Sequence, residues 1–281
     1  KSHRVKNGDD IDTDTTTPGL QPDISWTEQT KADDREKDLL LREGETSTED
    51  AFEVKTYQDS TWSRVKSHAV QLDKDGNQNI IRTKSIRVDQ EGNDTADISY
   101  SEQAKVSEQG LEVVNELRGD TGSTEDIFEV KTYTKAFNDS SSQMKSHSWQ
   151  LDVEGDGSRV RIKSHRVKDN EDYDTDPDTD GTQADVTWTE QTKVLDQAPV
   201  INELRGNTGS TEDVFEVKTY QDSTWLRMKS HAFQLDIDGN QNRIRIKSYR
   251  VKNNKDYDTD PDTEAIEPDI TWTEQIKIPE N

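Results

Sequence analysis

The sequence repeats itself, and this repetition limits the fold more than any other feature. The phrase STEDAFEVKTYQDSTW, which begins at Ser47, returns as STEDIFEVKTY at Ser123 and as STEDVFEVKTYQDSTW at Ser210. Two other phrases, QLDKDGNQN and DISWTEQTK, return in related forms along the chain. A repeat of this length predicts that one small structural unit occurs several times in succession.

The repeats divide the chain into three full units and one partial unit. We place the full units at residues 44–119, 120–206 and 207–281, and residues 1–43 match the second half of a unit. The opening letters KSHRVK recur at Lys163, inside a unit, and no methionine or signal peptide precedes them. We therefore expect a mature or trimmed polypeptide, either a piece of a longer array or a chain with a half-unit at its start.

Apolar and polar residues alternate inside each unit. Phe215 and Val217 alternate with charged residues, and Ile244 and Ile246 alternate with arginines and a lysine. This period of two, rich in β-branched and aromatic residues, is typical of strands that bury one face. In the first full unit we expect four strands, at 52–58, 63–73, 79–88 and 96–106. The predicted fold class is all-β, with tandem repeats of small antiparallel β units of about four strands, sandwich- or barrel-like, in an elongated array.

Three short motifs lie between or within these strands. The Asp-Gly pairs at Asp75 and Asp238 favour two-residue hairpin turns, because both residue types tolerate positive φ. The segments VVNELRG and VINELRG fit either a fifth strand or a short helical turn. At the KSH triplets the apolar residues switch from one face of the strand to the other. Such a switch requires a bulge, a sharp twist or a crossing between two packed sheets.

The composition excludes several classes of protein. Only 27% of the residues are hydrophobic and 34% are charged, which is too lean for one thick core and favours thin units. A net charge of −24 repels nucleic acid and anionic membranes, and attracts divalent cations or basic partners. The absence of cysteine excludes disulfides and thiol chemistry. Because no apolar run approaches the roughly 20 residues of a membrane helix, we expect no membrane insertion.

The acidic loops are the first candidate sites. Oxygen ligands on alternate residues of a turning chain can converge on Ca²⁺, which binds several of them. The loops DYDTDPDTD and DYDTDPDTE and the hairpin tips LDIDGNQN and LDKDGNQN have this pattern. The candidate calcium ligands are Asp172, Asp174, Asp176, Asp178, Asp256, Asp258, Asp260, Asp262, Asp236, Asp238, Asn240, Asp73, Asp75 and Asn77. A solvated acidic loop and an ordinary Asp-Gly turn are the alternative interpretations.

The repeated histidines and glutamates have structural interpretations. Every histidine belongs to a KSH triplet, none has a second histidine at close ligand spacing, and Ile86 and Tyr249 replace it at sister positions. This pattern favours packing over zinc binding. One glutamate in each DISWTEQTK-type phrase shares a strand face with an aromatic residue, so we expect it to pair with a basic residue, face a cavity or end the strand. Repetition in every unit argues against a single active site, and we predict that the protein is not an enzyme.

Trp62 and Trp225 are candidate ligand-binding residues. Both lie in the QDSTW turn, where exposed tryptophans beside Asp residues would form stacking platforms for sugars. Core packing is the alternative, and the second unit has no tryptophan at this turn. A multivalent carbohydrate-binding, lectin-like repeat protein is therefore the second functional hypothesis, with glycans as its partners.

Tandem β units in a strongly acidic chain are typical of proteins with a mechanical or adhesive function. In composition and tandem organisation the chain is similar to the acidic, cysteine-free extender domains of large bacterial adhesins, in which calcium stiffens the joints between β-sandwiches. This resemblance implies an extracellular or cell-surface structural repeat protein, the stalk of an adhesin or the subunit of a filament, rigidified by calcium. Because the partial unit leaves strand edges unpaired, we also expect self-association or contacts between neighbouring repeats.

Overall fold

The structure is a computed structural model of the chain. It describes residues 2–3, 5–6, 9–10, 24–41, 45–57, 61–89, 91–106, 112–173, 185–194, 198–210, 212–237, 239, 241, 243–256 and 269–276. Everything stated below refers to these residues.

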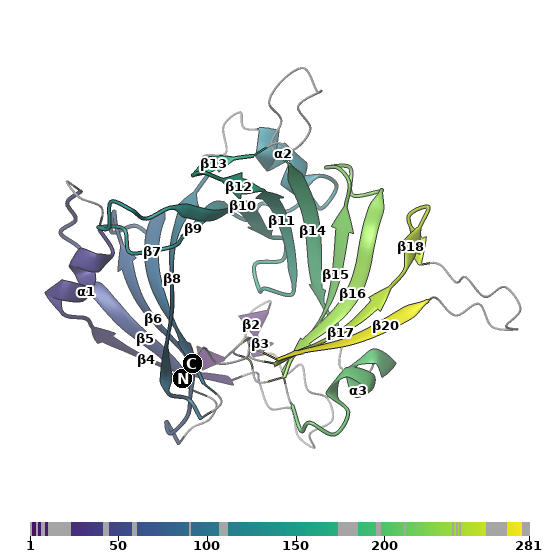
Figure 1. Ribbon diagram of the computed structural model, residues 1–281, viewed down its shortest axis with the longest axis horizontal. Coiled ribbons are helices and arrows are strands. Elements are labelled where there is room, and N and C mark those ends of the chain that lie inside the picture. Colours follow the sequence, from purple (N-terminus) through teal and green to yellow (C-terminus); the bar gives the residue numbers. More distant parts are fainter. Residues whose placement is uncertain are drawn as a thin grey trace, which may run out of the picture.

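Antiparallel strands form one large, open sheet (Figure 1). The order across the sheet is β1-β4-β5-β6-β7-β8-β9-β10-β11-β14-β15-β16-β17-β20. Its strands are β1 (Ser2–His3), β4 (Ile24–Lys31), β5 (Ala51–Tyr57), β6 (Val65–Asp73), β7 (Ile80–Val88), β8 (Asp94–Lys105), β9 (Ile127–Tyr133), β10 (Met144–Asp152), β11 (Arg159–His165), β14 (Val186–Lys193), β15 (Val214–Tyr220), β16 (Met228–Asp236), β17 (Arg243–Tyr249) and β20 (Ile270–Ile276). Three two-stranded ribbons accompany it: β2 (Val5–Lys6) with β3 (Asp9–Asp10), β12 (Val167–Lys168) with β13 (Glu171–Asp172), and β18 (Val251–Lys252) with β19 (Lys255–Asp256).

The β character is confirmed, whereas separate small units in an elongated array are not. The last strand of each sequence unit pairs directly with the first strand of the next, as β8 does with β9 and β14 does with β15. All the long strands therefore share one ladder of hydrogen bonds. Alternation in the sequence defines which face of a strand is buried, but it leaves open which strand lies along each edge.

The strand ends lie within a few residues of those predicted, and the KSH switch is a β-bulge. Thr56 pairs with Ser67 and Tyr57 pairs with Val65, so Lys66 is the extra residue on β6. The same shift falls at Lys145 in β10 and at Lys229 in β16. Each bulge inserts one residue and so moves the following side chains to the other face.

The predicted two-residue turns at the hairpin tips are wrong, because the loops are longer. Strand β6 ends at Asp73 and β7 begins at Ile80. The carboxylate of Asp73 accepts the backbone N–H groups of Gly76 at 3.0 Å and of Gln78 at 2.8 Å. These bonds stabilise a wider loop, in which Gly76 adopts a φ of +71° that favours glycine.

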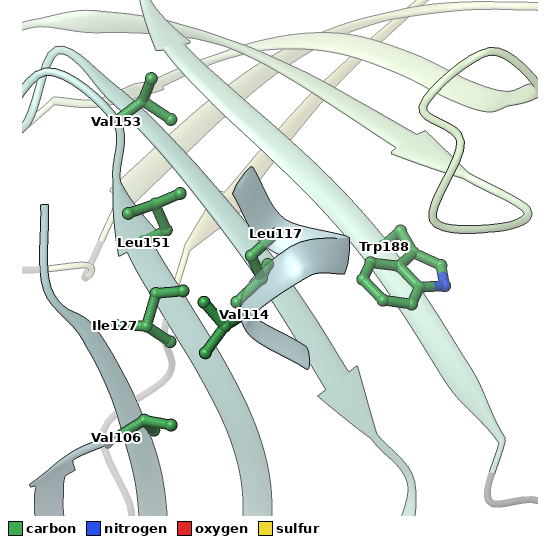
Figure 2. Packing of buried hydrophobic residues seen from close by; sticks show 7 residues of the cluster. All are labelled: Val106, Val114, Leu117, Ile127, Leu151, Val153 and Trp188. Atoms are coloured by element: carbon green, nitrogen blue, oxygen red, sulfur yellow. The ribbon is translucent and has the colours of Figure 1, made fainter. Parts of the chain in front are cut away.

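Three short helices each cover a small apolar cluster, and the helical interpretation of VVNELRG and VINELRG is confirmed. They are α1 (Asp34–Leu39), α2 (Glu112–Arg118) and α3 (Pro199–Arg205). Val114 and Leu117, three residues apart on α2, pack with Ile127 and Leu151 from the sheet (Figure 2). Separate clusters form around Leu40 below α1 and Leu204 below α3. The core is therefore divided into thin patches rather than one thick layer.

The sheet curves, and the three helices lie on its outer side (Figure 1). The curvature brings the first sequence unit against the third. Lys66 of β6 donates to both carboxylate oxygens of Glu212, at 3.0 and 2.8 Å, across 146 positions of the sequence. This ion pair holds distant parts of the chain together.

Candidate functional site

A buried histidine between two carboxylates is the most conspicuous polar arrangement in the structure. Nε2 of His147 lies 2.8 Å from Glu129 Oε1, and its Nδ1 lies 2.9 Å from Asp172 Oδ1. The histidine comes from β10, the glutamate from neighbouring β9, and the aspartate from the β12–β13 ribbon. His147 thereby fixes the ribbon to the sheet.

The same arrangement occurs in the other two units. His68 lies between Glu53 and Asp94, and His231 lies between Glu216 and Asp256. All three histidines are less than a tenth exposed. In each unit a lysine two residues after the glutamate pairs with that glutamate, and these lysines are Lys55, Lys131 and Lys218. The repeated FEVK and KSH phrases thus place one imidazole ring and one lysine around each half-buried glutamate.

These contacts shift the pKa values of the groups involved. The hydrogen bond from His147, opposed by burial and assisted by Lys131, lowers the pKa of Glu129 to about 2. His231 and Lys218 lower the pKa of Glu216 to about 2 in the same way. Burial alone would lower the pKa of His231, but Glu216 and Asp256 outweigh it, so its pKa is raised. A histidine with a carboxylate at each ring nitrogen is best satisfied when both nitrogens carry protons.

Only the second unit adds another histidine. His165 of β11 lies directly opposite His147 of β10, and its Nδ1 is 2.7 Å from Asp172 Oδ2. Ile86 and Tyr249 occupy the corresponding positions opposite His68 and His231. One ligand atom from each of His147, His165 and Asp172 lies within 4.8 Å of the others. The residues of this cluster are therefore candidate metal ligands.

A second repeated network joins each helix to the sheet. Arg161 of β11 donates to Glu190 of β14 at 2.8 Å and to the backbone carbonyls of Leu117 and Arg118, at the end of α2. A guanidinium favours this position because helix carbonyls point outward there and carry partial negative charge. Lys163 completes the contact through Glu116 of α2 at 2.7 Å.

The first and third units use matching residues. Arg82 pairs with Glu102, and Arg245 pairs with Glu274. Lys84 binds Glu36 of α1, and Lys247 binds Glu203 of α3. Three of the four repeated glutamates therefore pair with arginine, which was one of the alternatives drawn from the sequence. Glu28 instead accepts the hydroxyl of Tyr57 at 2.8 Å.

The structure separates the candidate calcium ligands into several groups. Asp172 and Asp256 bind the buried histidines described above. Asp73 accepts backbone N–H groups within its hairpin tip, and so does Asp236, which accepts that of Gln241. Asp75 and Asn77 cap the same tip as Asp73. The residues Asp174, Asp176, Asp178, Asp258, Asp260, Asp262, Asp238 and Asn240 lie outside the described residues.

The two candidate tryptophans have different environments. Trp62 is 45% exposed and packs edge-on against Tyr57. Trp225 donates its indole N–H to the carbonyl of Glu116 at 3.0 Å, and the guanidinium of Arg161 lies 4.4 Å from its ring centre. Trp225 therefore belongs to the packing between the second and third units, whereas Trp62 presents a free face.

Sequence reasoning missed the histidine pair because its members are 18 positions apart. Counting outward from the hairpin loop between β10 and β11 would have placed His147 opposite His165, since paired residues in a regular hairpin lie at equal distances from the turn. The lysine–glutamate contacts to the helices had no such local signal, because helix and strand are more than 40 positions apart.

Comparisons with protein-family models, curated proteins and solved structures find no match to this chain. Within the described part of the chain, no helix combines the length and apolar character needed to cross a membrane.

Proposed function

We propose that this chain is a structural protein of the cell surface or extracellular space that associates with itself through the edges of its sheet. It would serve as part of an adhesin stalk or as a filament subunit. One observation carries this function: the outer strand β20 exposes large apolar side chains. Repetition of the same ionic contacts in every unit agrees with a structural role, since a catalytic site would be expected in one unit alone.

Strand β20 exposes a surface that the equivalent inner strand buries. Trp188 of β14 is 5% exposed, because Tyr220 of β15 lies beside it and Trp225 packs edge-on at 5.7 Å. Its counterpart Trp272 on β20 is 52% exposed, and Ile276 is 61% exposed. Within the described residues, β20 pairs only with β17. An open edge with exposed apolar side chains favours the addition of another strand.

The first unit shows what covers the counterpart of β20, because Tyr57 of β5 lies directly opposite Trp26 of β4. Tyr57 and Trp62 reproduce the edge-on contact of Tyr220 and Trp225, with ring centres 5.1 Å apart in the first pair and 5.4 Å in the second. Arg245 of the third unit is the counterpart of Arg161, whose guanidinium contacts the ring of Trp225. Pairing of β20 with the opposite edge of another chain's sheet, at β1, would continue the sheet in a head-to-tail manner, which generates open filaments when the rotation does not close.

Calcium is part of this proposal. Each long acidic segment, 174–184 and 257–268, begins within two residues of an aspartate that is fixed to a buried histidine, Asp172 or Asp256. The aspartate that precedes each segment is thus fixed to the sheet, which reduces the entropy lost when the carboxylates gather around an ion. We expect Ca²⁺ to raise the melting temperature over that in EDTA, since an ion that binds only the ordered state stabilises it.

Sedimentation velocity at increasing protein concentration tests self-association. We expect the mass of the wild-type chain to rise with concentration, and the double variant Trp272→Lys/Ile276→Lys to remain monomeric because charged edge strands resist pairing. Leu226→Lys is the matched control, because Leu226 is 76% exposed and lies outside any strand. A wild-type chain that stays monomeric throughout the range would refute the proposal.

Carbohydrate binding is the second candidate function, and the exposed ring of Trp62 supports it. Binding of the wild-type chain to a glycan array that is lost in Trp62→Ala would favour this function. Trp225→Ala is a poor control here, because its ring contacts Arg161 and the variant would disturb packing. Trp272→Ala, which also removes an exposed tryptophan, provides the comparison.

A further inference from the structure

The histidine cluster of the second unit differs from its two sister sites in one respect that changes its chemistry. All three units have a histidine between two carboxylates, but only here does a second imidazole reach the same aspartate. We propose that His147, His165 and Asp172 bind a divalent transition-metal ion of the zinc type. This inference is independent of self-association and of calcium in the acidic segments.

The donor atoms suit such an ion. Two imidazole nitrogens and one carboxylate form a set that zinc, cobalt and nickel accept, whereas calcium prefers oxygen ligands alone. Asp172 already lies 2.9 Å from His147 Nδ1 and 2.7 Å from His165 Nδ1. In the absence of metal it accepts a hydrogen bond from Nδ1 of each ring. On metal binding each ring would free its Nδ1 for the ion and carry a proton on Nε2.

The outer contacts of the cluster are those expected around a metal-binding histidine. The other nitrogen of His147 donates to Glu129 at 2.8 Å, which is the carboxylate–histidine–metal arrangement that orients the ring. Among the described residues, Nε2 of His165 is buried without a hydrogen-bond partner.

An aromatic ring covers one side of the cluster, and Asp172 is partly exposed to solvent. Trp149 packs against both rings, with its centre 4.1 Å from that of His147 and 4.8 Å from that of His165. Asp172 retains 27% exposure of its side chain and lies on a two-stranded ribbon. Ligand atoms on a tetrahedral ion lie about 3.3 Å apart, so a small movement of the ribbon and rings closes the present spacing of up to 4.8 Å. A water molecule would complete the coordination.

Titration of the full chain with Co²⁺ tests the site, with millimolar Ca²⁺ present throughout to occupy the oxygen-rich loops. We expect one Co²⁺ per chain, with visible absorption typical of nitrogen ligands, quenching of tryptophan fluorescence and displacement by Zn²⁺. His165→Ile, which copies Ile86 of the first unit, should abolish this signal while circular dichroism stays unchanged. Glu129→Gln, which changes the outer contact to His147 and also the pair with Lys131, should weaken binding about 10–100-fold.

A gain-of-site variant keeps the test independent of any loss of folding. Tyr249→His places a second imidazole opposite His231, whose carboxylates Glu216 and Asp256 match those of the second unit. We expect this variant to bind two Co²⁺ per chain. The proposal is overturned if the wild-type chain gives no nitrogen-ligand spectrum, if His165→Ile binds as the wild type does, or if Tyr249→His still binds one ion.

Discussion

Arg161 offers the most direct way to measure what holds helix and sheet together. Its side chain is 3% exposed, pairs with Glu190 and two helix carbonyls, and lies against the ring of Trp225. Removing one member of a buried ion pair costs about 3–5 kcal/mol when the other charge is left alone. Here Glu190 keeps Arg159 at 2.8 Å, so the cost falls to the lower end of that range. We expect Arg161→Met to lower the free energy of unfolding by about 3 kcal/mol.

Arg245→Met in the third unit is the matched comparison. Arg245 makes the same contacts to Glu274 and the end of α3, but its side chain is 26% exposed. Within the described residues no aromatic ring covers it. An ion pair open to water contributes less than about 1 kcal/mol, so we expect a total loss of about 1 kcal/mol from Arg245→Met. Urea unfolding followed by circular dichroism measures both variants. Equal losses at the two positions would refute the argument that burial and the tryptophan contact set the strength of this network.

Four further predictions follow from the packing and the charges. The free energy of unfolding should fall as pH drops from about 4.5 toward 2, because the pKa of Glu216 is lowered to about 2 in the folded chain. The raised pKa of His231 adds stability below about pH 6.5 that is lost as pH rises through that pKa, so His231→Gln should flatten the alkaline side of a melting-temperature profile. If the melting temperature of His231→Gln changed with pH in parallel with that of the wild type, the role of His231 would be contradicted. Leu235→Ala, which empties a fully buried position, should cost about 2–5 kcal/mol in urea unfolding, and a loss below 1 kcal/mol would show that the cluster under α3 contributes little. Lys66→Ala should cost less than about 1 kcal/mol yet increase the radius of gyration in small-angle X-ray scattering, because Lys66 joins the first unit to the third, and an unchanged radius would count against that link.

The sequence was sufficient to predict the strands, because a period of two in the apolar residues is a local signal. The switch at KSH was also predicted, since the change of apolar phase requires an irregularity, and the structure shows a bulge at Lys66 and at its sister positions. The width of the hairpin tips was not predicted. It depends on the side chain of Asp73 accepting two backbone N–H groups, which competes with the tight turn that Asp-Gly favours.

The joining of the units into one sheet could not be predicted from the alternation of apolar and polar residues along each strand. A strand edge carries the same backbone donors and acceptors whatever its side chains are, so the partner of β8 is set by tertiary contacts such as Tyr100 beside Tyr133. The candidate site illustrates the same limit. His147 and His165 each read as an isolated residue in a KSH triplet, and only the pairing of β10 with β11 brings them together.

The continuity of the sheet between units can be measured with a single engineered disulfide, since the chain contains no cysteine. Gln103 of β8 and Val130 of β9 lie directly opposite each other across the junction of the first and second units. Directly opposed residues of antiparallel strands have Cα atoms about 4.5–5.5 Å apart, within reach of a disulfide. We predict that Gln103→Cys/Val130→Cys forms an intramolecular disulfide under native conditions, detected by faster migration without reductant. The control pair Gln103→Cys/Gln71→Cys is separated by the intervening strand β7 and should stay reduced. Failure of the first pair to cross-link, or equal cross-linking of both pairs, would contradict a single continuous sheet.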